Sequence, residues 1–120
     1  MIRIQPAARR DIEEALRWSL DNFGERALRR YQRLIAEALK EIAANPQLIP
    51  SYEMSGLQPG IRLYHLRHSR RRAIVEGESV REPRHFVAYL TVNKEVVVVR
   101  LLHDSMEIAR HLEGEHESPG

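Results

Sequence analysis

The sequence predicts an α+β fold in which a helical hairpin packs on one face of a small, mostly antiparallel sheet. Two amphipathic stretches, 8–23 and about 25–45, are separated by a single glycine, and helices joined so closely must run nearly antiparallel. Two β-type stretches, 85–92 and 95–102, are separated by only two residues, as in a tight hairpin. Helices and strands grouped along the chain in this way are typical of α+β proteins.

The first half of the chain supplies a short strand and both helices. Ile2 and Ile4 alternate with polar residues and predict a strand that Pro6 ends. Gly24 ends the first helix as a C-terminal cap, and Asn45-Pro46 ends the second. The expected apolar faces are Ala8, Ile12, Ala15, Leu16, Ser19 and Phe23 on the first helix, and Leu28, Tyr31, Ile35, Ala38, Leu39 and Ile42 on the second.

The second half supplies three more strands. Residues 47–59 contain two prolines, a glycine and two serines and are expected to form an irregular connection. A strand at 61–68 and a basic, loop-like stretch at 68–84 follow, and then the hairpin already described. Segment 96–102 is apolar except at Arg100, which is typical of a strand buried on both faces.

The chain is expected to close with a short helix and an acidic tail. The helix covers about 105–112, with Asp104 or Ser105 as its N-cap, and gives the order β-α-α-β-β-β-α. Residues 113–120 lack large apolar side chains, and we expect them to be disordered. Residues 1–112 then form a single domain, which suits a chain of 120 residues.

Composition restricts the chemistry and indicates the kind of partner. The chain has no cysteine, which excludes disulfides, thiolate metal sites and a cysteine nucleophile. Up to residue 106 it carries 18 basic and 13 acidic residues, a balance of +5 against +2 for the whole chain. This balance suits nucleic acid or an acidic protein segment, and a well-solvated surface equally. The first residues form a strand pattern rather than a signal peptide, so we expect a cytoplasmic protein without a membrane segment.

Three stretches, taken in order, carry a family resemblance. The first is Ala8-x-x-Asp11-Ile12-Glu13-Glu14-Ala15-x-x-Trp18, followed by Gly24 and Ala27-x-x-x-Tyr31. The second is Asn45-Pro46, followed by Gly60-Ile61-Arg62. The third is His85-Phe86-x-x-Tyr89, followed by Val99-Arg100-Leu101-Leu102-His103-x-x-Met106-Glu107. This ordered set spans about residues 2–112 and resembles the ParE/RelE superfamily of bacterial type II toxins, ParE most closely.

The resemblance implies a growth-inhibiting toxin that needs no cofactor. It implies a ParD-like antitoxin, whose disordered tail folds onto the toxin and whose other end binds operator DNA, so that the toxin meets DNA only indirectly. It also implies DNA gyrase as the target, whereas RelE relatives cleave messenger RNA on the ribosome. One departure is the connection 67–84, which is longer and more basic than the short turn usual in the family.

Arg100 is the one charged residue within the apolar strand. If the odd-numbered residues of 97–103 pack under the helical hairpin, Arg100 projects onto the open face of the sheet. Arg62, on a neighbouring segment, then joins it in a cationic patch suited to phosphate or carboxylate. The alternative is a structural ion pair of Arg100 with Glu95 or Glu82.

His103 follows directly on this strand. Beside Asp104 its imidazole could act as a general acid or base, but we favour a histidine that hydrogen-bonds backbone and fixes the turn after the strand. Asp104 is interpreted as a helix N-cap rather than as an orienting carboxylate. The residues that could serve a metal-independent ribonuclease are His103, His85, Arg100 and Arg62.

The nuclease interpretation is not favoured, and no metal site is expected. RelE-like nucleases usually carry several cations on the open face and a tyrosine near the C-terminus, where this chain has Met106. His111 with Glu107 forms only an i, i+4 pair, which more often marks a solvated helix face than a metal site. The spacing of the remaining histidines is not that of a helical metal site; these are His65, His68 and His85.

Two sets of residues are assigned to partners. The set assigned to the target comprises Arg100, His103, Met106 and Glu107. The set assigned to the antitoxin comprises Trp18, Leu20, Arg26, Arg30 and Arg33. Trp18 lies off the apolar stripe and either caps the edge of the core or anchors a partner helix. The arginines either are solvated, with Glu25–Arg29 and Arg33–Glu37 as helix pairs, or receive an acidic antitoxin tail.

Three functions therefore stand as hypotheses. The first is a non-enzymatic ParE-type toxin that traps the cleaved-DNA state of gyrase. The second is a RelE-like endoribonuclease. The third is an inactive homologue that only binds its antitoxin. The basic run 67–72, Arg-His-Ser-Arg-Arg-Arg, fits nucleic acid, an acidic protein or solvent, and no aromatic residue interleaves its arginines to stack on bases.

Overall fold

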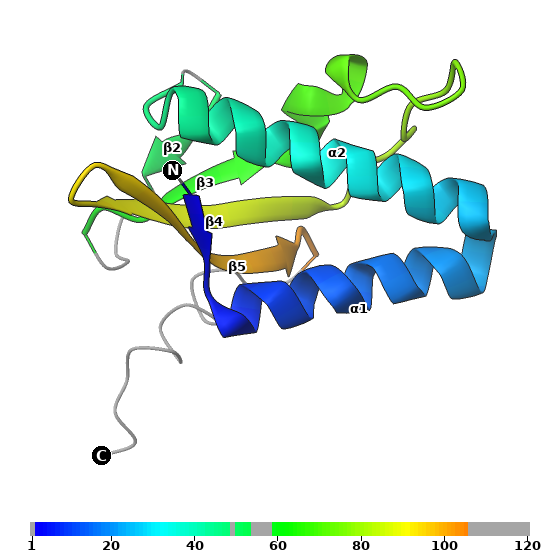
Figure 1. Cartoon of the computed structure of the whole chain (residues 1–120), viewed down its shortest axis with the longest axis horizontal. Helices are drawn as coiled ribbons and strands as arrows, with labels where there is room; N and C mark the ends of the chain where they lie inside the picture. Colours follow the sequence, from blue (N-terminus) through cyan, green and yellow to red (C-terminus); the bar gives the residue numbers. More distant parts are fainter. Residues whose placement is uncertain (1, 49, 54–58, 106–120) are drawn as a thin grey trace.

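The computed structural model describes residues 2–48, 50–53 and 59–105. The elements, in chain order, are β1 (Ile2–Ile4), α1 (Pro6–Phe23), α2 (Glu25–Ala44), β2 (Tyr52–Glu53), β3 (Arg62–His65), the 3₁₀ helix η1 (Leu66–Arg72), β4 (His85–Val92) and β5 (Glu95–His103) (Figure 1). The predicted closing helix and acidic tail lie outside the described residues, apart from the start of the helix. Among the described residues, no helix is long and apolar enough to cross a membrane.

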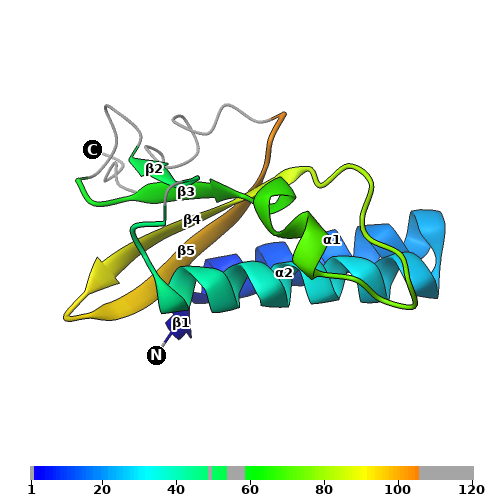
Figure 2. The same cartoon turned by 90° about the horizontal axis from the view of Figure 1, so that it is seen from above.

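The five strands form one mixed sheet with the order β1-β5-β4-β3-β2. β1 runs parallel to β5, and every other neighbouring pair is antiparallel. The antiparallel pair α1–α2 covers one face of this sheet (Figure 2). The predicted fold class, a helical hairpin on a mostly antiparallel sheet, is therefore confirmed.

The two helices bury side chains of different size against the sheet. α1 buries only small residues, Ala8, Ala15 and Ser19, while α2 buries the larger set Tyr31, Leu34, Ile35, Ala38 and Ile42. They meet the helix-facing side chains of the sheet, which include Tyr64, Val87, Tyr89, Val96, Val98 and Leu101. The principal core therefore lies between the helices and β3–β5.

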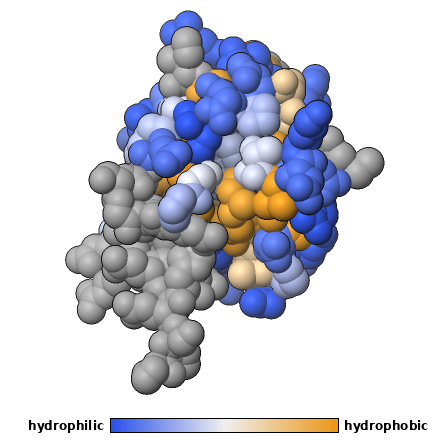
Figure 3. All heavy atoms as spheres, turned by 90° about the vertical axis from the view of Figure 1, so that its left-hand side faces the viewer, coloured by the Kyte–Doolittle hydropathy of each residue, from blue (hydrophilic) through white to orange (hydrophobic). Residues whose placement is uncertain are grey.

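A second, smaller apolar cluster lies on the opposite face of the sheet. Its buried members are Ile61, Leu63, Ala88 and Leu102, with Phe86, Leu90 and Val99 packed against them. Figure 3 looks instead at the end of the molecule that is on the left in Figure 1, and shows apolar surface in the middle with polar residues above it, below it and to its right.

An irregularity in β5 makes the predicted side-chain alternation wrong. Val98 lies opposite Tyr89 and Arg100 lies opposite Ala88, so Val99 is an additional residue in β5. Such a β-bulge shifts the alternation of the strand that carries it. Before the bulge the even-numbered Val96 and Val98 face the helices, and after it Leu101 does so. The expected uniform odd-numbered face does not exist.

Three further expectations about local structure need correction. Residues 47–59 are not wholly irregular, because β2 pairs with β3 through Tyr52 and Leu63. The strand expected at 61–68 ends at His65, and η1 occupies the start of the stretch expected to be loop-like. Phe23, placed on the apolar stripe of the first helix, is 69% exposed. It sits in the last turn of α1, where the stripe no longer has sheet beneath it.

Gly24 alone joins the two helices. Its φ is 93° and its ψ is −177°, a backbone conformation that is essentially restricted to glycine. Its N–H bonds Leu20 O at 2.9 Å, and its carbonyl accepts the N–H of Leu28 at 3.1 Å. One residue therefore ends α1, starts α2 and reverses the chain.

Replacing Gly24 by alanine is expected to lower the free energy of unfolding by roughly 1–3 kcal/mol, to be measured by urea unfolding. The cause is the backbone conformation, since no atom lies within 4 Å of the position of an added Cβ. Asn22→Ala is the control, because it removes only an exposed hydrogen bond to the carbonyl of Trp18. It should change stability by less than about 0.5 kcal/mol. Equal effects of the two substitutions would contradict the assignment.

Candidate functional site

Three histidines from neighbouring strands gather at one end of the sheet. His65 ends β3, His85 begins β4 and His103 ends β5. Antiparallel pairing places His85 directly opposite His103 and His65 opposite Phe86, the next residue of β4. The rings of His85 and His103 meet edge to face, with their centroids 5.2 Å apart. We call these three residues the histidine cluster.

Tyr31 of α2 is the hydrogen-bond partner of His85. Its hydroxyl accepts the backbone N–H of Arg84 at 3.0 Å and lies 2.6 Å from Nδ1 of His85. The Tyr31 hydroxyl is therefore hydrogen-bonded to the backbone of Arg84 and to the ring of His85 at the same time. Burial, with the nearby His103 adding to the effect, lowers the pKa of His85 to about 4. Burial likewise raises the pKa of Tyr31 to about 12.

Asp104 ties the end of β5 to the neighbouring elements. Its carboxylate lies 3.0 Å from Nε2 of His65 and 3.0 Å from Nε of Arg84, and its N–H bonds the carbonyl of Arg84 at 2.8 Å. Burial raises the pKa of Asp104, but the hydrogen bonds from His65 and Arg84 outweigh burial and hold this pKa below its usual value.

Asp104 therefore orients other side chains, whereas the helix that it was expected to cap lies outside the described residues beyond Ser105. Nδ1 of His65 accepts the N–H of Arg67 at 3.1 Å, so the ring proton of a neutral His65 lies on Nε2 and faces Asp104. Burial lowers the pKa of His65 in spite of the carboxylate. The pair is thus a neutral histidine hydrogen-bonded to a carboxylate, and this contact fixes the orientation of the ring.

His103 behaves as the favoured interpretation expected. Its Nδ1 accepts the backbone N–H of Ser105 at 3.1 Å and lies 2.7 Å from the Ser105 hydroxyl oxygen. The histidine therefore fixes the turn that follows β5, and a general acid or base role would compete with this bond.

Arg100 and Arg62 do not form the predicted cationic patch. Arg100 contacts Asp11 of α1, with 2.7 Å from Nε to Oδ2 and 3.2 Å from Nη2 to Oδ1. Among the described residues its ion-pair partner is Asp11 and not Glu95 or Glu82, so the guanidinium reaches α1 rather than the open face of the sheet. Arg62 donates from Nε and Nη2 to the hydroxyl and carbonyl oxygens of Ser51, at 2.9 and 3.0 Å.

The four residues considered for a ribonuclease are thus only partly assembled. His85 and His103 are adjacent, but the contacts of Arg62 and Arg100 hold these arginines on Ser51 and Asp11. A neutral His85 engaged with Tyr31 also supplies no cation for a phosphorane. Over the part of the chain that the structure describes, no three His, Asp or Glu side chains are placed to share a metal ion.

The residues assigned to the antitoxin lie on the outer surface of the helical hairpin. Trp18 is 59% exposed and Leu20 is 43% exposed, and the Trp18 ring meets that of Phe23 edge to face at 5.5 Å. Trp18 therefore pairs with another exposed ring rather than closing the core. Arg33 forms the expected pair with Glu37 at 3.9 Å.

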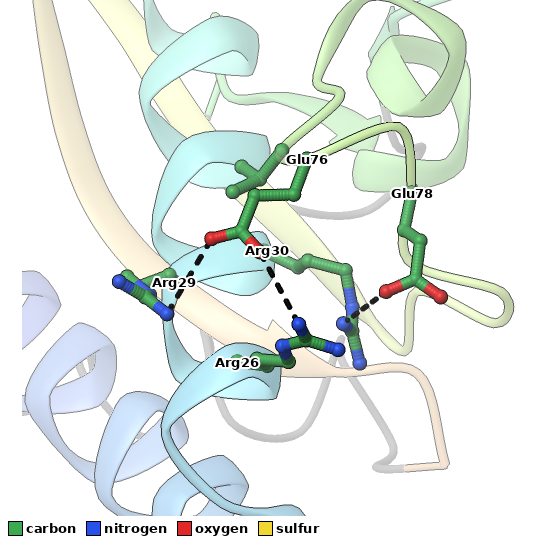
Figure 4. A pocket seen from close by; sticks show the side chains of 6 residues that line it. Arg26, Arg29, Arg30, Glu76 and Glu78 are labelled. Carbon is green, nitrogen blue, oxygen red and sulfur yellow. Dashed lines mark hydrogen bonds and ion pairs between the residues drawn. The ribbon is translucent and has the colours of Figure 1, made fainter.

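The remaining arginines of α2 face an acidic turn. Arg29 pairs with Glu76 rather than with the expected Glu25, at 3.6 Å, and Arg26 contacts the same carboxylate at 3.5 Å. Arg30 lies 3.0 Å from Glu78 (Figure 4). These contacts were absent from the prediction because the two glutamates lie about fifty residues further along the chain.

The family model described as "ParE toxin of type II toxin-antitoxin system, parDE" matches residues 2–108. The chain belongs to the ParE toxin family. No match was found among curated protein sequences.

Solved structures from Helicobacter pylori are similar to this ParE-family chain. A copper-bound point mutant of a toxin is 16% identical over 87% of this chain and 93% of its own, with a TM-score of 0.56. A conserved hypothetical protein, solved in solution, has the same identity and coverage and a TM-score of 0.46. The first likeness confirms the fold.

Of the predicted target residues of this ParE-family chain, Arg100 and His103 both lie on β5, whereas Met106 and Glu107 lie outside the described residues. Sequence reasoning missed Tyr31 and Asp11 as polar contacts, although both stood in the stretches that carried the resemblance. Tyr31 was counted only as an apolar residue of its helix. A buried tyrosine usually finds a partner for its hydroxyl, and that rule was the available signal.

Proposed function

We propose that this ParE-type toxin inhibits DNA gyrase and is neutralised by a ParD-like antitoxin in the cytoplasm. The observation that carries the proposal is the match of the ParE family model over residues 2–108. In this proposal the toxin meets operator DNA only through its antitoxin, and residues 1–112 act as one toxin domain.

The contacts of the four residues considered for a ribonuclease support binding rather than RNA cleavage. Arg62 and Arg100, the cations that cleavage would need, are held by Ser51 and Asp11. His85 is kept neutral by burial, and His103 holds the turn after β5. A rigid end of a strand is well suited to present a binding segment.

The proposed target surface comprises His103, Met106 and Glu107, together with Arg100, whose guanidinium is held on Asp11 beside it. Asp104 and His103 organise the chain where this surface begins, because they bond Arg84, His65 and Ser105. The proposed antitoxin surface comprises Trp18, Leu20, Arg26, Arg30 and Arg33. Its exposed tryptophan and its arginines are the residue types enriched at binding hot spots.

Purified gyrase, relaxed plasmid and ATP provide the test. The toxin is expected to reduce supercoiling and to raise the amount of linear DNA recovered after gyrase is denatured. Adding the antitoxin encoded beside the toxin is expected to restore supercoiling. His103→Ala should weaken inhibition, whereas Arg17→Ala, an exposed change on α1, should not.

Transcript integrity, scored in the same induced cells, distinguishes the rival functions. Gyrase inhibition with intact messenger RNA supports the proposal. Cleaved messenger RNA with unaffected gyrase would overturn it in favour of a RelE-like endoribonuclease. Normal growth with tight antitoxin binding would overturn it in favour of an inactive homologue.

A further inference from the structure

A tight turn in the long connection between β3 and β4 presents two carboxylates. Val75 and Glu78 are joined by two backbone hydrogen bonds, of 2.8 and 2.9 Å. Between them Glu76 has a φ of 51° and Gly77 a φ of 79°, as in a two-residue hairpin turn. We call residues 75–78 the acidic turn. Its own backbone bonds give it its shape, independently of what its side chains contact.

The acidic turn rests on three arginines of α2. Arg26, Arg29 and Arg30 lie on one face of the helix, because residues three and four apart are neighbours. Glu76 bridges Arg26 and Arg29, and Glu78 contacts Arg30 (Figure 4). Three guanidinium groups therefore surround two carboxylates.

The three ion pairs between the acidic turn and α2 are individually weak. Each joins one guanidinium nitrogen to one carboxylate oxygen, and two of the three are 3.5 Å or longer. The side chains of Arg26, Arg29 and both glutamates are more than half exposed. Exposed ion pairs of this kind contribute little to stability, and a two-point carboxylate contact would bind an arginine better.

The connection is anchored on both sides of the turn. Ala73 is fully buried, Val80 packs against the principal core, and Arg70 donates from Nε to the carbonyl of Val80 at 2.5 Å. Within η1, the Ser69 hydroxyl donates to the carboxylate of Glu41 of α2 at 2.6 Å. Displacement of the turn from α2 would therefore involve only the exposed segment between Ala73 and Val80.

We propose that the acidic turn occupies a carboxylate-binding site on α2, and that an acidic segment of the antitoxin displaces it. In the complex, carboxylates of that segment replace Glu76 and Glu78 on Arg26, Arg29 and Arg30. The inference rests on the proposed function, which supplies the antitoxin. It adds Arg29 to the antitoxin surface and gives the toxin an internal competitor for its own partner.

The lining of the site favours an acidic peptide over nucleic acid. The groups that already occupy it are carboxylates. The residues around it are the three arginines, the two glutamates and Val75, with no aromatic ring on which a base could stack. An acidic peptide also matches the positive balance of the folded body of the chain.

Fluorescence anisotropy with a labelled octaglutamate peptide at low salt tests the site directly. The double variant Glu76→Gln/Glu78→Gln is expected to bind the peptide roughly fivefold tighter than the unsubstituted protein, because the competing carboxylates are removed. The matched control is Glu13→Gln/Glu14→Gln, two exposed glutamates of α1, which changes net charge equally. A gain of the same size in both variants would overturn the proposal, since net charge alone would then explain it.

A second pair of variants tests the arginines. Arg26→Gln/Arg29→Gln/Arg30→Gln should lose most peptide binding, and adding the two glutamate substitutions to it should restore none. Arg9→Gln/Arg10→Gln/Arg17→Gln removes the same charge from exposed positions of α1 and should retain more binding. Equal losses in the two triple variants would overturn the site. Circular dichroism confirms that each variant is folded.

The gyrase assay separates this inference from the proposed function. The variant Glu76→Gln/Glu78→Gln should inhibit gyrase as the unsubstituted toxin does, but should bind the antitoxin severalfold tighter. Peptide binding as predicted with no effect on gyrase would overturn the proposed function alone. If this variant inhibits gyrase but binds neither the peptide nor the antitoxin more tightly than the unsubstituted toxin, only the proposal that the acidic turn competes with the antitoxin is overturned.

Discussion

Replacing Asp11 by alanine is expected to lower the free energy of unfolding by about 2–4 kcal/mol. Its carboxylate accepts two hydrogen bonds from Arg100 and one, of 3.0 Å, from the backbone N–H of Leu101. The side chains of Asp11 and Arg100 are only 14% and 17% exposed, so water replaces these contacts poorly. The pairing of β1 with β5 ends at Val98. Beyond that point the carboxylate of Asp11, rather than a neighbouring strand, accepts the backbone N–H of Leu101.

Urea unfolding at pH 7 measures the effect. Asp21→Ala is the matched control, because Asp21 is an exposed carboxylate on the same helix. It should change the unfolding free energy by less than about 0.5 kcal/mol. Asp11→Asn should fall between the two, since its amide oxygen still accepts the N–H of Leu101 but carries no charge. A loss of under about 1 kcal/mol for Asp11→Ala would show that the contact is not structural.

Asp11 also shows which features of the fold the hydrophobic periodicity of the sequence predicts and which it does not. The hydrophobic repeat of the two helices and the alternation of the hairpin strands are local, and from them the fold class was predicted correctly. Asp11 belonged to the polar part of its helix pattern, with nothing local to distinguish it from a solvated residue. Its role arises from β5, which lies about ninety residues further along the chain.

The bulge at Val99 had a similar effect on the site. A strand that is apolar on both faces has no alternation from which its register can be read, so one additional residue is invisible in the sequence. That residue reverses the alternation after Val98, and the expectation for Arg100 failed with it. The histidine cluster likewise depends on the register between β3, β4 and β5, which the spacing of histidines along the chain does not encode.

Acidification is expected to destabilise the protein between pH 7 and pH 4, mainly through His85. Its pKa is about 4 in the folded protein and about 6.5 in the unfolded chain. Between these values the unfolded chain takes up a proton that the native state does not, so the free energy of unfolding falls as the pH falls. This difference in pKa corresponds to a loss of about 3 kcal/mol in the free energy of unfolding between pH 7 and pH 4. The lowered pKa of His65 acts in the same direction.

Urea unfolding at intervals between pH 7 and pH 4 tests this expectation. The ring of His85 contacts the Tyr31 hydroxyl and the ring of His103. His65, Asp104 and Asp11 influence its pKa through their charges. His85→Gln keeps a hydrogen-bonding group beside the Tyr31 hydroxyl but does not titrate. Most of the change of the unfolding free energy with pH should therefore disappear in this variant. His68→Gln should keep most of this pH dependence, because it leaves His85 and its contact with Tyr31 unchanged. A slope unchanged by His85→Gln would contradict the burial of a neutral histidine at this position.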